Sequence, residues 1–108
     1  MIIQKEVAGS GIRFSAQEGS KEIGRAFLYI LSNDLHEEPF GLMEDVEVDK
    51  EHRGKGLGTR LVEMVVRTAK ERGCYKLVAT SRYDRPRVHD LYRRLGFQDH
   101  GTEFRMDF

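Results

Sequence analysis

The stretch Arg53-Gly54-Lys55-Gly56-Leu57-Gly58 is the most informative part of this sequence. An apolar and acidic run typical of a β-strand precedes it, and a helical pattern follows it directly. Three glycines at alternate positions let the backbone turn tightly and approach an anion with no Cβ in the way, so that several N–H groups point to one side. The N-terminus of the following helix adds partial positive charge. The stretch, called the glycine loop below, therefore predicts a site for a phosphate or pyrophosphate.

Two better-known glycine loops do not fit. A Walker A loop has Gly-Lys followed by Ser or Thr, whereas Lys55 lies between glycines and Thr59 follows Gly58. A dinucleotide fingerprint needs its third glycine where Thr59 stands and lies in a larger doubly wound domain. The pattern that fits is Arg/Gln-x-x-Gly-x-Gly/Ala, with Arg53, Gly56 and Gly58 at its fixed positions. The alternative is a glycine-rich turn in front of a surface helix.

Composition restricts the class of protein. The 108 residues include 18 Lys plus Arg and 18 Asp plus Glu, so no basic field predicts binding to nucleic acid or to an anionic membrane. No apolar run approaches the roughly 20 residues that span a bilayer, and no basic segment with a following apolar stretch opens the chain. We therefore expect one domain, residues 1–108, that is cytoplasmic and binds neither nucleic acid nor membrane.

The sequence also predicts that no metal is bound. Cys74 is the only cysteine, so an internal disulfide and a cysteine-based metal cluster are excluded, and we interpret it as a small buried hydrophobe. The histidines lie far apart in the chain without metal-ligand spacing, at His36, His52, His89 and His100.

The first half of the chain predicts strands separated by turns. Strands are expected over Ile2–Val7, Ile12–Ala16, Glu22–Leu31 and Gly41–Val48, with Gly9-Ser10-Gly11 as a turn between the first two. The third of these strands is apolar on both alternating sets over most of its length, which suits a strand covered on both faces.

The second half alternates helix and strand. Apolar residues at three- and four-residue spacing predict a helix from Leu57 that ends near Gly73. A short strand over Tyr75–Ser81 follows, and then a helix capped by Asp84 that ends at Gly96. Strand-like residues at Phe97 and Thr102–Phe108 close the chain. A strand, a crossover helix and a further strand require a parallel connection, so an α/β (α+β) fold with a mixed, mainly antiparallel sheet is predicted.

The loop pattern and this element order resemble the GNAT superfamily of N-acetyltransferases. A second match is His89-Asp90-Leu91-Tyr92-Arg93-Arg94-Leu95-Gly96-Phe97, which is similar to the family's Leu/Phe-Tyr-x-x-x-Gly-Phe motif at the end of the second helix. The resemblance covers residues 41–108 well and the first 40 by topology. The helical pair that the family has between its first two strands has no room here, because Gly9-Ser10-Gly11 stands in its place. A minimal GNAT-like fold with two main helices is therefore expected.

The resemblance assigns residues to acetyl-coenzyme A. It implies that loop amides hold the pyrophosphate, that main-chain groups of β-strand residues Val46 and Val48 meet the amide-bearing arm, and that Tyr92 donates a proton to the departing thiolate. Arg85 is a further candidate for a phosphate contact, although the family often has asparagine there. The loop positions implied are Arg53, Gly54, Lys55, Gly56, Leu57, Gly58 and Thr59.

A closer resemblance concerns Gly41-Leu42-Met43-Glu44-Asp45-Val46-Glu47-Val48, which looks like a segment of glucosamine-6-phosphate N-acetyltransferases. It implies that Glu44, with help from Asp45, is the acid-base element. Adjacent strand residues point to opposite faces, so both can share one site only if a bulge re-aims one of them. These enzymes use a basic residue near the C-terminus for the sugar phosphate, where this chain has Asp107, with Arg105 two residues earlier.

The predicted function is transfer of an acetyl group from acetyl-coenzyme A to a primary amine, directly within a ternary complex. A protonated amine must lose a proton before it attacks a thioester, and a carboxylate beside it both attracts the cation and removes the proton. The alternatives are a protein or peptide N-acetyltransferase and a coenzyme-A-binding module without turnover. A homodimer that pairs through Phe104–Phe108 is also expected.

Overall fold

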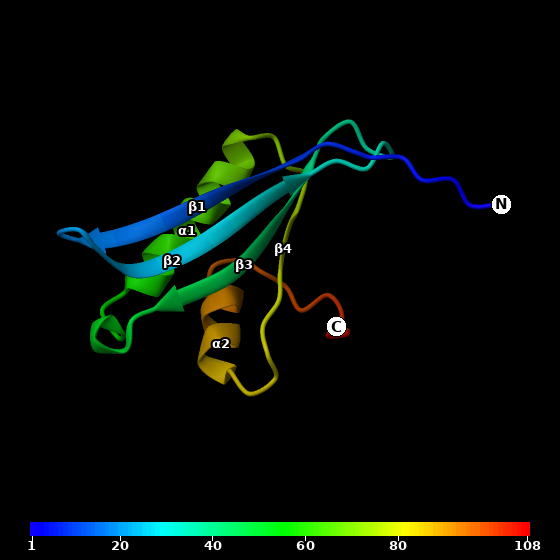
Figure 1. The fold of residues 1–108 in the computed structure, drawn as a ribbon. Coiled ribbons are helices and arrows are strands. Elements are labelled where there is room, and N and C mark those ends of the chain that lie inside the picture. The colour runs from blue at the N-terminus through cyan, green and yellow to red at the C-terminus, as the bar shows by residue number, and fades with distance from the viewer.

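A computed structural model of residues 1–108 contains one four-stranded sheet in the order β1-β2-β3-β4 (Figure 1). Strands β1 (Gly9–Glu18), β2 (Lys21–Leu31) and β3 (Phe40–Val48) are antiparallel neighbours, and the short β4 (Leu77–Ala79) runs parallel to β3. The prediction of a mixed, mainly antiparallel sheet is confirmed.

Two α-helices follow the antiparallel strands in the chain, α1 (Leu57–Glu71) and α2 (Pro86–Arg94), and a 3-10 turn η1 (Lys50–His52) precedes α1. Helix α1 begins at Leu57 as predicted, and Gly73, at φ +77°, follows its C-cap Arg72. Neither α-helix has the length and apolar character that crossing a bilayer requires.

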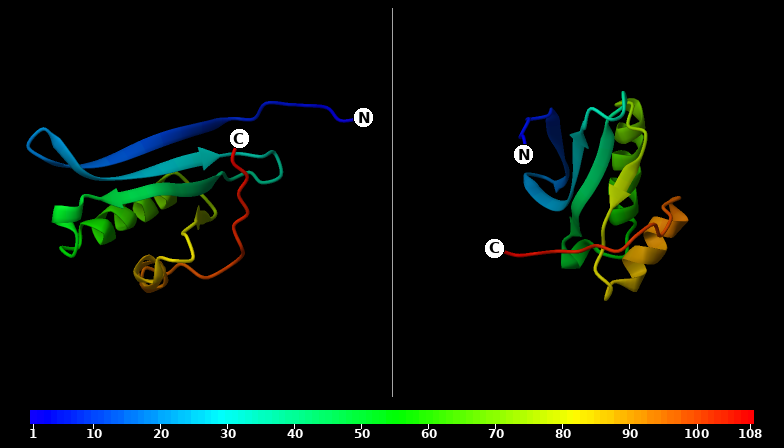
Figure 2. Two further views of the ribbon diagram at one scale, coloured as in Figure 1. Left: turned by 60° about the horizontal axis from the view of Figure 1, so that its bottom comes forward. Right: turned by 90° about the vertical axis from the view of Figure 1, so that its right-hand side faces the viewer.

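The hydrophobic core lies between α1 and one face of the sheet, as the turned views show (Figure 2). Its buried members come from β2, β3 and α1, and full burial of a Leu, Val or Met side chain contributes about 1.5–3 kcal/mol. They are Ala26, Leu28, Met43, Leu61, Val62, Val65 and Ala69.

Strand β2 is covered less evenly than its composition predicts. Gly24, Ala26 and Leu28 are buried against α1, whereas Phe27 and Tyr29 on the opposite face are only half-buried. The prediction that both faces are covered is therefore wrong, because α1 covers only the face that carries Ala26 and Leu28. The opposite face contributes instead to the cleft described below.

Three predicted boundaries are wrong. Residues 2–7 form no strand, and Gly9-Ser10-Gly11 opens β1 instead of forming a turn. Gly11 is paired with Tyr29, whose ring atoms lie 3.1 Å from where a Cβ on Gly11 would stand, so glycine accommodates the tyrosine ring. The N-cap of α2 is Arg85 and not Asp84, and no side chain caps that helix.

The C-terminal segment also differs from expectation. Neither Phe97 nor residues 102–108 form a strand, since the segment does not pair with any strand of the sheet. Figure 2 shows it leaving α2 and extending toward the side of the sheet opposite α1.

Candidate active site at the end of β3

A β-bulge in β3 is the centre of the candidate site. The register between β2 and β3 shifts where two residues, Asp45 and Val46, oppose the single residue Ala26. The side chains of Met43, before the bulge, and of Val46 and Val48, after it, all pack toward α1. Met43 and Val46 are three residues apart, whereas inward-facing residues of a regular strand are two apart. The extra residue, Asp45, takes a left-handed φ of +52°, which Asp tolerates better than most residues. The bulge keeps both carboxylates, those of Glu44 and Asp45, out of the core.

The sheet also opens beside the bulge. Strand β4 pairs with β3 only over Gly41–Met43, and from Glu44 onward β3 has no partner on that side. A cleft of about 530 Å³ lies at this opening, bounded by the outer face of β2, the bulge, the chain after β4, helix α2 and residues 103 and 105. The separation of β3 and β4 thus creates room for a ligand next to the main chain of the bulge.

The three carboxylates of β3 that line the cleft differ in their partners. Asp45 accepts two hydrogen bonds from Arg25, with Nε–Oδ2 and Nη2–Oδ1 distances of 3.1 Å each. Glu47 accepts a hydrogen bond from Arg53 at 2.8 Å. Glu44 lines the same cleft, is exposed, and forms no ion pair or hydrogen bond with another side chain of the protein. Of these three carboxylates, Glu44 alone is free to meet a cation or accept a proton.

The Arg25–Asp45 pair makes one part of the stability pH-dependent. The hydrogen bonds from Arg25 hold the pKa of Asp45 below its ordinary value. The stabilisation is therefore present above the unfolded pKa of about 3.9 and is lost as pH falls through the lower folded value.

We expect Asp45→Asn, which keeps a residue that tolerates positive φ, to lower Tm by no more than a few degrees near pH 7, because both side chains are partly exposed. The difference in Tm from the wild type should shrink as the pH falls below about 4 in thermal melts. A difference that stays constant from pH 7 to pH 3 would show that the ion pair contributes nothing.

The glycine loop connects η1 to α1 at the same end of β3. Gly54 (φ +79°) and Gly56 (φ +82°) are left-handed, and Gly56 is the N-cap of α1 without a side-chain cap. The backbone N–H groups of residues 54–59 donate to no acceptor in the chain, and no acidic residue lies in the first turn of α1. A continuous run of free N–H donors at a helix N-terminus is suited to a phosphate or pyrophosphate.

The other predicted cofactor residues surround this loop. The guanidinium of Arg53 donates through Nε to the carbonyl oxygen of Val48 at 2.9 Å and through Nη2 to Glu47, so it ties the loop to the end of β3. The side chains of Val46 and Val48 pack against the core, which leaves their main chain at the opening of the sheet. Lys55 is exposed, and Leu57, Gly58 and Thr59 begin α1.

Helix α2 forms the opposite wall of the cleft. Tyr92 is half-buried, its ring lies 5.3 Å from the ring of Phe97, and burial raises the pKa of its hydroxyl. Arg85, the N-cap of α2, is exposed and lines the cleft. The structure therefore brings Glu44, Asp45, Val46, Arg85 and Tyr92 to one cleft. The glycine loop does not line this cleft and follows the end of β3.

Several residues of this site are not identified from sequence. Phe27 and Tyr29 lie with their ring planes 7° apart and centroids 6.2 Å apart on the outer face of β2, where they form part of the cleft. Arg25 is recognisable only through its contact with Asp45, 20 positions away. The hydroxyl of Ser81, in the wall after β4, is buried and has no hydrogen-bond partner. A strand with aromatics at alternate positions beside an arginine is the one sequence signal for this face.

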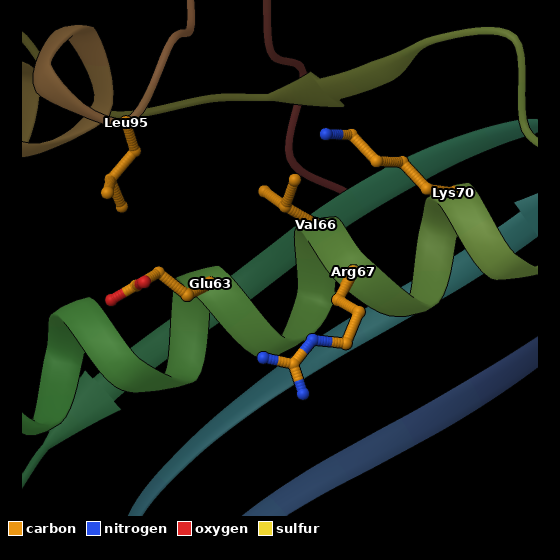
Figure 3. A pocket seen from close by; sticks show the side chains of 5 residues that line it. All are labelled: Glu63, Val66, Arg67, Lys70 and Leu95. Atoms are coloured by element: carbon orange, nitrogen blue, oxygen red, sulfur yellow. The ribbon is translucent and has the colours of Figure 1, made fainter.

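A second hollow lies between the outer face of α1 and the end of α2 (Figure 3). It measures about 350 Å³, and Figure 3 shows Glu63, Val66, Arg67 and Lys70 along α1 with Leu95 across from them. No residue of the bulge or of the glycine loop lines it. The second hollow is therefore not part of the candidate site.

The sequence is similar to those of known N-acetyltransferases. A relative from Oryza sativa subsp. japonica, "Probable glucosamine 6-phosphate N-acetyltransferase 2", is 40% identical over 68 residues, which are 63% of this chain and 39% of the relative. Thialysine N-epsilon-acetyltransferase of Bos taurus is 37% identical over 57 residues, 53% of this chain and 34% of that protein. The chain thus spans well under half the length of these curated relatives.

Solved structures agree with the fold. The crystal structure of glucosamine-6-phosphate N-acetyltransferase from Arabidopsis thaliana superposes with a TM-score of 0.79 at 26% identity, covering 91% of this chain and 67% of that chain. The Acetyltransferase (GNAT) family matches residues 3–97, which include every strand and helix described above. The chain therefore belongs to the GNAT family of acetyltransferases.

Proposed function

We propose that this protein transfers an acetyl group from acetyl-coenzyme A to a primary amine, directly within a ternary complex. The observation that carries the proposal is the run of free N–H groups at residues 54–59 beside a cleft in which Glu44 has no partner. The first feature fits the pyrophosphate of the cosubstrate, and the second fits a protonated amine. Family membership supports the same chemistry.

The chain offers main-chain and side-chain groups to the cosubstrate. The loop amides of residues 54–59 would bind its pyrophosphate, and the peptide groups of Val46 and Val48 would hydrogen-bond to its amide-bearing arm where β3 has no partner strand. Arg85 is placed to meet an anionic group at the end of α2. The absence of Cβ atoms at the loop glycines allows a close approach of the ligand to the backbone.

The reaction follows from the groups in the cleft. An amine with a pKa near about 10 loses its proton to Glu44, directly or through water, and its nitrogen attacks the thioester carbonyl carbon. The N–H of Val46 at the bulge is the candidate donor to the carbonyl oxygen as it gains negative charge. The carbon–sulfur bond then breaks, and the Tyr92 hydroxyl donates a proton to the thiolate. The nitrogen loses its second proton as the amide forms, and this proton passes through water to the tyrosinate, which restores Tyr92.

A direct transfer is favoured over an acyl-enzyme because no thiol lies in the cleft. Cys74, the only cysteine, is half-buried after α1, does not line the cleft, and burial raises the pKa of its thiol. A raised pKa reduces the thiolate fraction that could act as a nucleophile.

The acceptor is proposed to be a small amine. The two curated relatives are named for a phosphorylated amino sugar and for thialysine, both small molecules with a primary amine. Arg105 lines the cleft but donates to Asp107 at 2.8 Å, so a phosphate would have to compete with that carboxylate. An amine without a phosphate therefore suits the cleft at least as well, and a peptide amine is the second candidate.

The test is release of free thiol from acetyl-coenzyme A in the presence of glucosamine 6-phosphate, thialysine and an N-terminal peptide, each tested separately. Turnover that depends on one of the amines supports the enzyme. Cosubstrate binding in a melting assay without turnover for any amine in a broad panel would favour the coenzyme-A-binding module.

We also propose a homodimer through the C-terminal segment. Phe104, Met106 and Phe108 alternate along it with 91%, 77% and 113% relative exposure, and β4 ends the sheet without a neighbour on its outer side. A second copy could pair with such an edge and cover these side chains. Light scattering should give twice the mass of 12.5 kDa, and a monomeric mass at working concentration would contradict the dimer.

A further inference from the structure

A cluster of ligating side chains lies at the turn between β3 and the glycine loop. Asp49, Glu51 and His52 each offer one ligand atom, and these atoms lie within 4.8 Å of one another. The backbone N–H of His52 donates to the carbonyl oxygen of Asp49 at 2.9 Å, which closes the turn and brings the two side chains to one side. The tip of the β1–β2 hairpin lies at the same end of the molecule (Figure 1) and adds Glu18 and Lys21.

The imidazole of His52 has the environment of a metal ligand. Its Nε2 lies 3.3 Å from Oε2 of Glu18, and a hydrogen bond from Nε2–H to that carboxylate leaves Nδ1 with a lone pair. Nδ1 is buried and has no hydrogen-bond partner in the protein. In metal sites, a histidine usually binds the metal through one ring nitrogen and donates a hydrogen bond from the other nitrogen to a carboxylate or carbonyl oxygen. The contact between His52 and Glu18 has this arrangement.

The charge of the cluster fits a divalent cation. Three carboxylates, those of Glu18, Asp49 and Glu51, lie around the imidazole of His52. The cation paired with this set is Lys21, whose Nζ lies 3.8 Å from Oδ2 of Asp49. The three carboxylates therefore outnumber the one lysine paired with them, and this excess of negative charge suits a divalent ion.

We propose that this cluster binds one divalent transition-metal ion, through carboxylate oxygens of Asp49 and Glu51 and Nδ1 of His52, with water in the remaining position. Glu18 acts as a positioning residue that fixes the imidazole. A set of one nitrogen and two oxygens suits Zn²⁺ or Mn²⁺, whereas Mg²⁺ and Ca²⁺ take oxygen ligands. Because Arg53 follows His52 directly, the ion stabilises the turn that leads into the glycine loop. The proposal does not depend on acetyl transfer.

The first test is a Zn²⁺ titration of chelator-treated, tag-free protein against a chromophoric indicator, with Mg²⁺ as the comparison ion. We expect one Zn²⁺ per chain. His52→Gln and Asp49→Asn should each weaken the affinity by more than about tenfold, and Glu18→Gln by about tenfold. The matched controls His100→Gln and Glu63→Gln, at exposed positions outside the cluster, should bind as the wild type does. Failure to bind Zn²⁺ one to one, or full affinity in His52→Gln, would overturn the site.

The second test needs no variant and so does not depend on the folding of one. A long-range ¹H–¹⁵N spectrum distinguishes the two ring nitrogens of each histidine. Addition of Zn²⁺ should shift Nδ1 of His52 and leave the rings of His36, His89 and His100 unchanged. A shift confined to another histidine, or no shift of His52, would refute the proposal.

Discussion

Glu44→Gln is expected to lower kcat by a factor of about 10² to 10⁴, the range that general base catalysis contributes. The substitution keeps the shape and hydrogen-bonding capacity of the side chain but removes the group that accepts the proton. Because Glu44 lies at the bulge and not in the glycine loop, the KM for acetyl-coenzyme A should change little. Steady-state kinetics with the best amine from the panel measure both constants.

The pH dependence of the variant separates a base from a purely structural residue. Once the pH approaches the amine pKa of about 10, the amine no longer needs a base, so the deficit of Glu44→Gln should shrink as pH rises. A deficit that is the same at pH 7 and pH 9.5 would argue against proton removal by Glu44.

Two neighbouring variants serve as comparisons. Asp45→Asn should reduce turnover less than Glu44→Gln, because the carboxylate of Asp45 is already held by Arg25. Tyr92→Phe should also have a smaller effect, since a coenzyme A thiolate can leave without a proton donor. If Asp45→Asn proves the more damaging change, the role of the base belongs to Asp45.

The parts of the fold predicted from sequence are those with local causes. Helix α1 follows from the three- and four-residue spacing of its apolar residues Leu61, Val62, Val65 and Ala69. The glycine loop follows from the conformations that glycine permits. The sequence predicts the bulge as a condition for Glu44 and Asp45 to share a site. The step from Met43 to Val46 in the apolar pattern is the local signal that such a bulge leaves.

The parts that were missed have non-local causes. The start of β1 depends on Gly11 fitting beside Tyr29, and the ionisation of Asp45 depends on Arg25, each contact joining residues far apart in sequence. The alternating apolar residues of 102–108 indicate a strand, but a strand needs a partner, and the sheet of this chain ends at β4 without using them.

Gly56→Glu is expected to abolish the thermal stabilisation that acetyl-coenzyme A, coenzyme A or adenosine diphosphate gives to the wild type. A ligand at about 100 times its Kd that binds only the native state adds roughly 2.7 kcal/mol, which is a large shift of Tm for a domain of this size. The new carboxylate would lie at the N-cap of α1, where it competes with the pyrophosphate for the free N–H groups of residues 54–59. Scanning fluorimetry with and without each ligand measures the effect.

The effect of the added charge in Gly56→Glu can be separated from the effect of backbone strain, because Gly73 at the other end of α1 has a similar backbone conformation. Gly73 also has a left-handed φ, +77° against +82° for Gly56, and a Cβ at either position would have no other atom within 4 Å. Gly73→Glu should therefore suffer similar backbone strain, about 1–2 kcal/mol, and still respond to all three ligands, because it lies at the opposite end of α1. Gly56→Ala should share the strain and lose less of the ligand response than Gly56→Glu, since its Cβ hinders the approach of the pyrophosphate but adds no charge. If Gly56→Glu responds as Gly73→Glu does, the loop does not bind the pyrophosphate; if only Gly56→Glu loses the response, the anion is held at the N-terminus of α1.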